Sequence, residues 1–329
     1  MKIKYLVPSL LFILFATGCQ KKSDTKDAEL TKIYFNGYDP NIGTNGVNWS
    51  EIYSINPDGS GLSQLTNFSN NGTKNVRSIE PCFNSDTTRL AFISNKAIVD
   101  PHYNLFSMKF DNSDLLQLTN SASIGSEYYK PIGIREFTQL ELYLLEWNKI
   151  SGQNFHGEIV TAQNPSGGFT IYTQYPNDGD CRDPFWIKPY LKFIYTSDKS
   201  GAREIYIVEN YGNNKYQITF NGLEKSSPKS SPDGSKIVFV SKLNTGTINH
   251  SEIFIMNIDG SNIIQLTNYS ISGTIPKVTG TPVFSPDGQK IIYTSNESGS
   301  NQIYIMKVDG AEKQKITSTT MKIFNPIAR

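Results

Sequence analysis

A pattern of four short strand-like segments, separated by turn signals, recurs along most of this chain. Residues 281–317 give the clearest copy, in which SPDG and a later DG supply the proline and glycine that reverse the chain. Residues 282–285, 290–295 and 302–307 carry the β-branched and aromatic residues of buried strands, and the more polar residues 313–317 predict an exposed edge strand. The unit is therefore predicted to be a four-stranded antiparallel sheet.

The second half of this unit occurs six times, although the copy that starts at Gly157 is degenerate. Each copy ends in a threonine, and these threonines follow one another at intervals of 46 to 54 residues. They are Thr66, Thr119, Thr173, Thr219, Thr267 and Thr317. Because one small sheet cannot bury both of its faces alone, six copies of this length predict a ring of sheets that pack on one another.

The first half of the unit is complete in only five copies. Residues 323–329, IFNPIAR, supply a sixth first strand, and residues 32–36, KIYFN, supply a sixth second strand. Joining the two ends of the chain in one sheet removes the open edges of the ring. We therefore predict an all-β fold over residues 31–329, a six-bladed β-propeller of four-stranded blades whose last blade is closed by both termini.

The blade pattern P-x-F-S-P-D-G, I-x-F-x-S, I-Y, D-G and L-T resembles the WD-like repeat of the TolB β-propeller family. The resemblance covers residues 32–329 and implies the propeller fold. It restricts function much less, because propellers of this kind serve as adaptors, peptidase gates and lyase scaffolds. TolB proteins carry an α/β domain before the propeller, and we expect this chain to lack it.

The amino-terminal residues predict export. Lys2 and Lys4 precede an apolar run at residues 5–15, which is typical of a secretory signal. Gly18-Cys19 then resembles the lipobox of bacterial lipoproteins, which implies a signal peptide over residues 1–18, a lipid on Cys19 and, from Gln20, the outer membrane. Residues 19–30 are expected to form a disordered tether, with the propeller facing the periplasm or the cell surface. A plain signal peptide cleaved nearby is the alternative.

Composition and motifs further limit the kinds of partner and of chemistry that the chain is expected to have. Lysine and arginine total 31 against 30 acidic residues, so the charge balance gives no reason to expect a nucleic acid partner. Cys82 and Cys181 are too few for a disulfide framework and are interpreted as buried residues, without a known role. The three histidines are widely spaced and no G-x-S-x-G elbow occurs, so we predict no metal, no cofactor and no catalytic residue.

The strongest candidate site is the residue before each first-strand proline. First strands line the axial channel of a propeller, so residues at this one repeat position should form a ring around the channel. The ring combines charged and neutral hydrogen-bonding side chains, and Arg182, Tyr129 and Lys225 lie beside it in the sequence. The predicted binding residues are Glu80, Lys130, Arg182, Asp183, Ser227, Thr281 and Asn325. The alternative is that these side chains only solvate a water-filled channel.

Other polar and aromatic patterns have simpler interpretations. A polar residue heads the third strand of every copy, and in four of the six copies it is a carboxylate, Glu51, Glu158, Glu204 or Glu252. With one such group per blade the carboxylates lie too far apart for paired acid–base chemistry, so they are predicted to form hydrogen bonds in turns or between blades. The acidic loop 177–180 has the ligand type for calcium but lacks the further spaced ligands. The aromatic residues of 128–175 are interpreted as core, with an interaction surface as the alternative.

These observations favour a non-enzymatic, monomeric envelope lipoprotein whose propeller binds an envelope protein or a peptide segment. The alternative is a propeller at the cell envelope that binds a carbohydrate or another small ligand, or acts as a lyase. A lyase should show clustered metal ligands or charged catalytic groups at one channel mouth, whereas an adaptor should show a channel that accepts a chain segment. The sequence does not identify the partner, or decide whether the channel holds a cation.

Overall fold

The fold is known from a computed structural model, in which the described residues form 24 strands. The described residues are 29–38, 50–68, 78–83, 87–95, 104–118, 128–137, 140–151, 154–163, 169–171, 177–187, 192–209, 214–245, 248–268 and 279–329. Between residues 128 and 171, the backbone of the strands is described without the side chains. Within these ranges, no segment forms an apolar helix of bilayer-spanning length.

The strands form six four-stranded antiparallel sheets, here called blades 1 to 6. Blade 1 consists of β24 (Lys322–Ala328), β1 (Ile33–Tyr38), β2 (Ser50–Ile55) and β3 (Ser63–Gln64). Blade 2 consists of β4 (Ser78–Phe83), β5 (Arg89–Ser94), β6 (Asn104–Lys109) and β7 (Leu116–Gln117). Blade 3 consists of β8 (Tyr128–Phe137), β9 (Leu140–Ser151), β10 (Asn154–Gln163) and β11 (Phe169–Ile171).

The remaining blades repeat the same order of strands. Blade 4 consists of β12 (Cys181–Ile187), β13 (Lys192–Ser197), β14 (Glu204–Glu209) and β15 (Asn214–Gln217). Blade 5 consists of β16 (Lys225–Ser230), β17 (Lys236–Thr245), β18 (Ile248–Asn257) and β19 (Ile264–Gln265). Blade 6 consists of β20 (Thr279–Phe284), β21 (Lys290–Ser295), β22 (Gln302–Lys307) and β23 (Gln314–Lys315).

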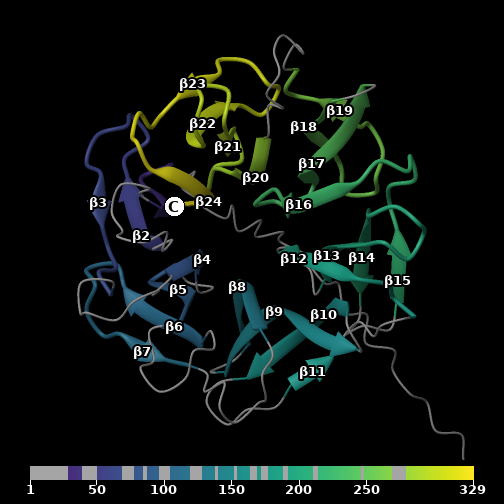
Figure 1. Ribbon diagram of the computed structural model, residues 1–329, viewed down its shortest axis with the longest axis horizontal. Helices are drawn as coiled ribbons and strands as arrows, with labels where there is room; N and C mark the ends of the chain where they lie inside the picture. Colours follow the sequence, from purple (N-terminus) through teal and green to yellow (C-terminus); the bar gives the residue numbers. More distant parts are fainter. Residues whose placement is uncertain are drawn as a thin grey trace, which may run out of the picture.

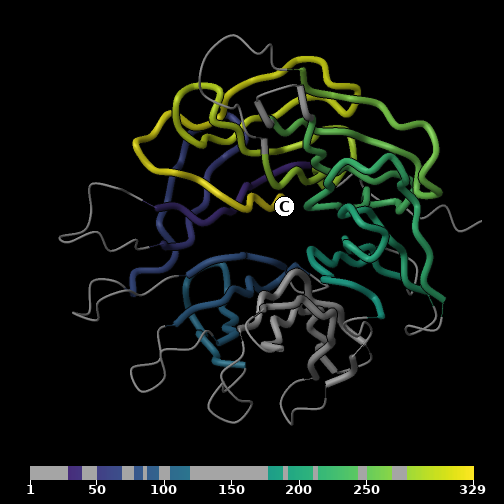
Figure 2. The backbone as a smooth tube through the Cα atoms, turned by 45° about the vertical axis from the view of Figure 1, so that its right-hand side comes forward, coloured from purple at the N-terminus to yellow at the C-terminus, as the bar shows by residue number. Residues whose placement is uncertain are grey.

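The blades surround a central axis, as the view down that axis in Figure 1 shows. The first strand of each blade, β24, β4, β8, β12, β16 or β20, lies innermost, and the inner strands of neighbouring blades contact one another. Figure 2 shows the same ring turned by 45°, with the C-terminal strand ending near its centre. The prediction of an all-β propeller of four-stranded blades is confirmed, and the six sheets match the six copies of the sequence unit.

Blade 1 is assembled from both ends of the chain. β24 pairs antiparallel with β1, so that Ile33 lies opposite Ala328, and β1 pairs in turn with β2. The ends of these strands are joined by backbone hydrogen bonds, in which Lys32 N donates to Arg329 O at 2.9 Å and Arg329 N donates to Lys32 O at 2.9 Å. The predicted closure is therefore correct, with strand bounds shifted by one or two residues.

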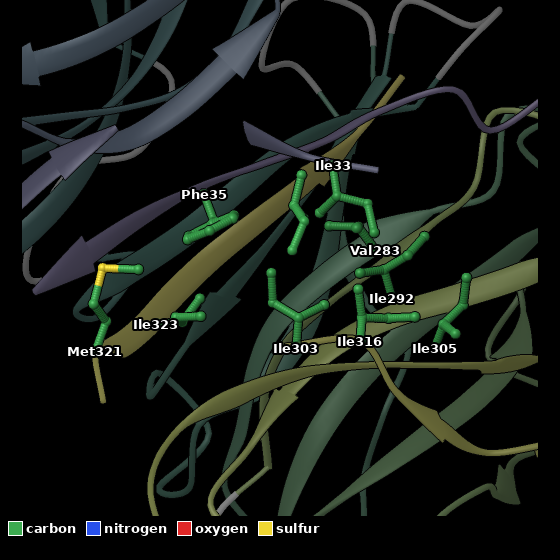
Figure 3. Packing of buried hydrophobic residues seen from close by; sticks show 10 residues of the cluster. Ile33, Phe35, Val283, Ile292, Ile303, Ile305, Ile316, Met321 and Ile323 are labelled. Atoms are coloured by element: carbon green, nitrogen blue, oxygen red, sulfur yellow. The ribbon is translucent and has the colours of Figure 1, made fainter. Parts of the chain in front are cut away.

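The hydrophobic core lies between adjacent blades. In blade 6, five of the six residues of β21 and five of the six of β22 are buried, because each strand has a neighbouring blade on both faces. One cluster combines Ile33 and Phe35 of β1 and Ile323 of β24 with Ile292 and Ile303 of blade 6 (Figure 3). Each such side chain contributes roughly 1.5–3 kcal/mol when fully buried, so closure of blade 1 also completes the core of blade 6.

The Asp-Gly hairpins between third and fourth strands also join neighbouring blades. Gly260 has φ +83°, and a Cβ on it would lie 2.2 Å from the carbonyl oxygen of Ile218 in the preceding blade. Gly310 meets Leu266 O in the same way at 2.9 Å, and Gly59 of blade 1 meets a carbonyl of blade 6 at 2.6 Å. Glycine is required at these tips by the turn and by the close approach of the next blade.

Gly260→Ala should therefore destabilise the protein more than Gly222→Ala. Both glycines have left-handed φ, at +83° and +72°, but a Cβ at Gly222 would meet nothing within 4 Å. The backbone cost is about 1 kcal/mol in both variants, and the clash at residue 260 adds about 1–3 kcal/mol. Chemical denaturation of the two variants measures the difference, and equal losses would contradict an inter-blade contact at this hairpin.

Deleting residues 323–329 should destabilise the whole propeller. The deletion removes most of β24, unpairs β1 and exposes one side of the cluster that blades 1 and 6 share. A loss of several kcal/mol is expected, which corresponds to a fall in Tm of more than about 10 °C or to failure to fold. Thermal unfolding followed by circular dichroism tests this, and a truncated protein that melts within a few degrees of the parent would show that the termini do not close the ring.

Candidate functional site

Five of the six residues of the predicted ring share an unusual backbone conformation. At each of these positions φ is positive, between 43° and 55°, although none of the residues is glycine. The residues are Glu80, Asp183, Ser227, Thr281 and Asn325. Left-handed φ costs about 1–3 kcal/mol at a residue with a Cβ, so the surrounding structure must hold each residue in place.

A β-bulge in the inner strand produces this conformation. In β12, for example, the pairing with β13 shifts register between Arg182 and Phe185, so Asp183 and the following proline are left out of the pairing. Proline has no N–H to donate, and a bulge is one of the few places where a strand tolerates it. Blade 3 differs, because Lys130 stays in register opposite Glu146 and the shift comes after Pro131. The side chain of Lys130 lies outside the described residues.

Ring residues of neighbouring blades are hydrogen bonded to each other. Asn325 Nδ2 donates to Glu80 Oε1 at 2.9 Å and to Asn36 Oδ1 at 3.1 Å, which links blade 1 to blade 2. Ser227 N donates to Asp183 Oδ2 at 3.2 Å, which links blade 5 to blade 4. All five described ring side chains are partly exposed. The structure thus joins four of the predicted residues in two pairs across neighbouring blades, and Thr281 occupies the equivalent position in blade 6.

Cys82, two residues after the ring residue Glu80, is buried. Cys82 of blade 2 is 6% exposed, and burial raises the pKa of its thiol to about 12. The charge of Lys229, from blade 5 on the other side of the ring, lowers the pKa of this thiol, while that of Glu80 raises it. Lys229 Nζ also lies 4.5 Å from the ring centroid of Phe185. The Cys82 thiol stays protonated at neutral pH, which makes it a poor nucleophile.

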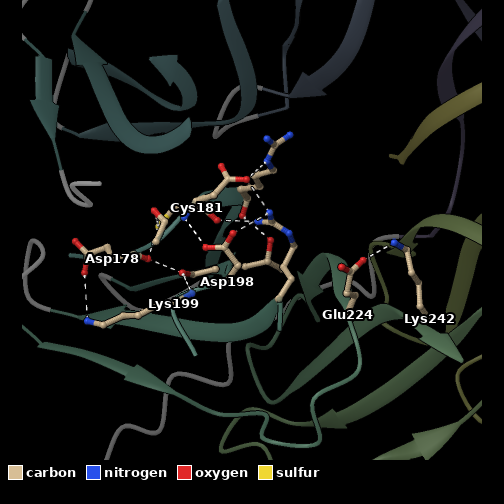
Figure 4. Close-up of polar contacts among 12 residues, drawn as sticks. Asp178, Cys181, Asp198, Lys199, Glu224 and Lys242 are labelled. Atoms are coloured by element: carbon tan, nitrogen blue, oxygen red, sulfur yellow. Dashed lines mark hydrogen bonds and ion pairs between the residues drawn. The ribbon is translucent and has the colours of Figure 1, made fainter. Parts of the chain in front are cut away.

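Arg182 belongs to a cluster of ion pairs at the start of blade 4. Arg182 Nε lies 2.9 Å from Asp180 Oδ2, and Arg203 Nη2 lies 2.7 Å from the same oxygen. Lys215 Nζ lies 2.7 Å from Asp178 Oδ2, and Asp180 N donates to Asp198 Oδ1 at 2.7 Å. Figure 4 shows this cluster around Asp178 and Asp198, with the pair Glu224 and Lys242 beside it.

These ion pairs explain the acidic loop 177–180 without calcium. The carboxylates of Asp178 and Asp180 are neutralised by lysine and arginine side chains, which compete with any cation. Among the described residues, no group of three or more histidine, cysteine, aspartate or glutamate side chains is arranged to hold a metal ion.

Lys225 does not extend the polar mouth, contrary to the expectation from the sequence. Its side chain is 1% exposed, and its Nζ lies 3.2 Å from Glu204 Oε2 in the preceding blade. Lys225 Nζ also donates to Asn221 Oδ1 and to Leu223 O. Burial lowers the pKa of this ammonium group, and the Glu204 carboxylate opposes that shift. The carboxylate, the amide and the carbonyl together make a buried position acceptable for a lysine.

The carboxylates at the heads of the third strands have a structural role, as predicted. Glu51 accepts a hydrogen bond of 2.5 Å from the closing threonine Thr66, and Glu204 and Glu252 do so in their own blades. The same threonine oxygen accepts a hydrogen bond from the backbone of the third strand, as from Ile52 N at 2.8 Å. Each pair therefore fixes the fourth strand onto the third, and the carboxylates are used within the fold.

The analysis of the sequence predicted the ring position but neither the β-bulge nor the left-handed conformation of the ring residue. The proline that follows each ring position is the signal that indicates them, because it cannot join a regular strand pairing. Chemically, the resulting ring offers carboxylates, hydroxyls, an amide and backbone groups, which together suit hydrogen bonding to a polar chain segment.

Comparisons with known proteins agree with this fold. No protein-family model matches the chain. A stretch of 84 residues is 36% identical to the Tol-Pal system protein TolB of Roseobacter denitrificans, and it covers 26% of this chain and 18% of that protein. A longer stretch of 186 residues is 26% identical to the protein TolB homolog of Chlorobaculum tepidum, and it covers 56% of this chain and 36% of that protein.

Among solved structures, TolB from Acinetobacter baumannii superimposes with a TM-score of 0.66 at 18% identity, over 90% of this chain and 66% of that one. At this identity the superposition shows the fold alone. The matched stretches span only about a fifth to a third of the curated relatives' own length. Repeat sequence, blade topology and these likenesses together identify the chain as a TolB-like β-propeller.

Proposed function

We propose that this protein is a non-enzymatic lipoprotein of the cell envelope, tethered through Cys19, whose propeller binds an extended segment of another envelope protein. The binding site is the ring of Glu80, Asp183, Ser227, Thr281 and Asn325, together with Lys130 and Arg182. The observation that carries this proposal is the repeated bulge, which holds a polar, partly exposed residue in a strained conformation at the same place in five blades.

The position of the inner strands supports a peptide as the ligand. Each inner strand pairs on one side only, with the second strand of its own blade, so its other edge faces the channel. Backbone N–H and C=O groups on such an edge can pair with the backbone of an incoming segment, while side chains select its sequence. Ser227 N already donates to a side chain of the neighbouring blade, so amides of this edge are within reach of groups in the channel.

The relatives support an envelope role without defining it. The relative with 36% identity is described as a Tol-Pal system protein, but the matched stretch covers 18% of that protein. We therefore carry over an adaptor role at the envelope and assign no specific partner. The outer membrane, facing the periplasm or the cell surface, is the location that the lipobox of Cys19 supports.

Reversing two charges at the mouth tests the site. The double variant Lys130→Glu and Arg182→Glu should weaken partner binding by a few kcal/mol if the charge pairs with the partner become desolvated. The loss should be less than about 1 kcal/mol if these pairs stay at a solvent-exposed rim. Lys290→Glu with Lys315→Glu is the matched control, because it changes the same net charge at exposed residues of blade 6. Crosslinking in cells supplies the partner, and affinity and Tm are then measured together.

The fold should survive in both double variants, since Arg182 is 40% exposed and the control lysines lie at the surface. Unchanged affinity with an unchanged Tm would remove the binding site from the channel mouth. In that case the aromatic segment 128–175 of blade 3 becomes the next candidate.

Cys19→Ser should release the protein from membranes. One lipidated cysteine would carry the whole attachment, and serine cannot take the thioether-linked lipid. Fractionation of cells followed by a high-salt wash measures the attachment. A variant that still sediments with membranes after the wash would exclude the proposed anchor.

A further inference from the structure

Blade 4 breaks the repeat pattern immediately after its closing threonine. At this position the other described copies carry exposed polar residues, Asn67, Asn268 and Ser318. Blade 4 carries Phe220 instead, and its side chain is 76% exposed. No other exposed large hydrophobic residue in the described part of the chain exceeds 48%. The sequence thus places an aromatic side chain in solvent where the other described copies carry a polar one.

At the next position the difference is reversed, because blade 1 carries an aromatic residue there and blade 4 a polar one. In blade 1 it is Phe68, which turns inward and stacks on Phe92 at a centroid distance of 6.2 Å. In blade 4 it is Asn221, whose side-chain oxygen accepts a hydrogen bond from the buried Lys225. The aromatic and polar residues have therefore exchanged places, so that the aromatic ring points outward in blade 4.

A buried ion pair holds this segment, residues 219–224, which we call the Phe220 loop. Lys225 Nζ lies 3.2 Å from Glu204 Oε2, and the two side chains are 1% and 2% exposed. Gly222 N donates to Glu204 Oε1 at 2.7 Å, and Leu223 N donates to Asn221 Oδ1 at 3.2 Å. The residues that follow Phe220 are thus fixed at several points, and the conformation of the loop is set before any partner arrives.

Lys225, the cation of this ion pair, occupies a position at which other blades bury a small, uncharged residue. At the equivalent position, blades 2 and 4 bury Ser78 and Cys181, which need no charged partner. Burying an ammonium group is unfavourable unless it is fully paired, so packing alone does not favour a lysine at this position. Single exposed hydrophobic residues are common, but an exposed aromatic residue in a loop that a buried ion pair fixes has the character of a preorganised anchor.

We propose that the Phe220 loop is a second binding element, separate from the channel mouth, and that Phe220 inserts into an apolar pocket of a protein partner. A pocket fits because one side chain protrudes, its loop neighbours Asn221 and Glu224 are exposed and polar, and Gly222 between them has no side chain. The exposed pair of Glu224 and Lys242 supplies a charged rim of both signs. A lipid surface fits less well, because insertion would bring the Glu224 carboxylate to the bilayer.

A photoreactive phenylalanine analogue, p-benzoylphenylalanine, tests the proposal in cells that express the full chain. It replaces Phe220 in one variant and Asn268, the equivalent exposed residue of blade 5, in the control. Irradiation should give a protein adduct of defined mass from position 220, with a yield at least about tenfold above that from position 268. Phe220→Asn, which installs the residue of other blades, should reduce co-purification of the same protein about tenfold at unchanged Tm.

Several outcomes would overturn this proposal. Equal yields from positions 220 and 268 would show unspecific collisions, and an adduct of twice the chain mass would show self-association. Adducts to lipid alone, or no adduct, would exclude a protein partner. The channel variant Lys130→Glu and Arg182→Glu should leave the adduct at position 220 unchanged, so failure of the channel proposal and failure of this one are distinguishable.

The role of the ion pair has its own test. Glu204→Gln with Lys225→Met removes both charges, and Gln302 shows that glutamine suits the first position, because its Oε1 accepts from Thr319 N at 3.1 Å in blade 6. With the analogue at position 220, this double variant should lose adduct several-fold while keeping a folded propeller by circular dichroism. An unchanged yield would show that the ion pair does not present Phe220.

Discussion

The pairing of β24 with β1 is the interaction on which the rest of this structure depends. A ring of sheets has no exposed inner faces only when every blade has two neighbours, and this pairing supplies the last blade with its inner strand. The closing strand also reaches the blade on its other side, since the guanidinium of Arg329 lies 4.2 Å from the ring centroid of Phe110 in blade 2. One strand therefore completes the contacts of three blades.

Two local features that recur in several blades keep the ring regular. The Asp-Gly tip fits a carbonyl of the preceding blade, and the glutamate and threonine pair holds the fourth strand to the third. These features use buried polar groups that are satisfied within one blade or between neighbours, so their energies repeat around the ring. The inner strands then carry the bulges, which leaves the residues of the channel mouth free to vary from blade to blade.

Much of the architecture was predictable because its signals are local. The closing threonines give the blade period, and strand bounds such as Lys290–Ser295 and Gln302–Lys307 follow from β-branched and aromatic runs between glycine turns. The left-handed ring residues were not predictable from residue type, since Glu80 and Thr281 rarely adopt that conformation by preference. Their φ is imposed by the proline and the pairing around it.

The burial of Lys225 was missed for a different reason. Its neighbours along the chain are polar, so the sequence favours solvent, and its partner Glu204 lies on another blade. Only the three-dimensional arrangement shows that the exchange of aromatic and polar residues at positions 220 and 221 provides the amide oxygen that the ammonium group needs. Long-range pairs of this kind carry no periodic signal in a sequence.

The closure of blade 1 also has a consequence for the order of folding. The hydrogen bond between Thr31 and Arg329 joins residues 298 positions apart, whereas the other blades pair strands that are adjacent in sequence. Contacts of such long range form slowly, because the loss of chain entropy precedes the gain from pairing. Five blades can therefore assemble while β1 and β24 are still apart, and during that interval the open ring exposes the strand edges at which chains aggregate.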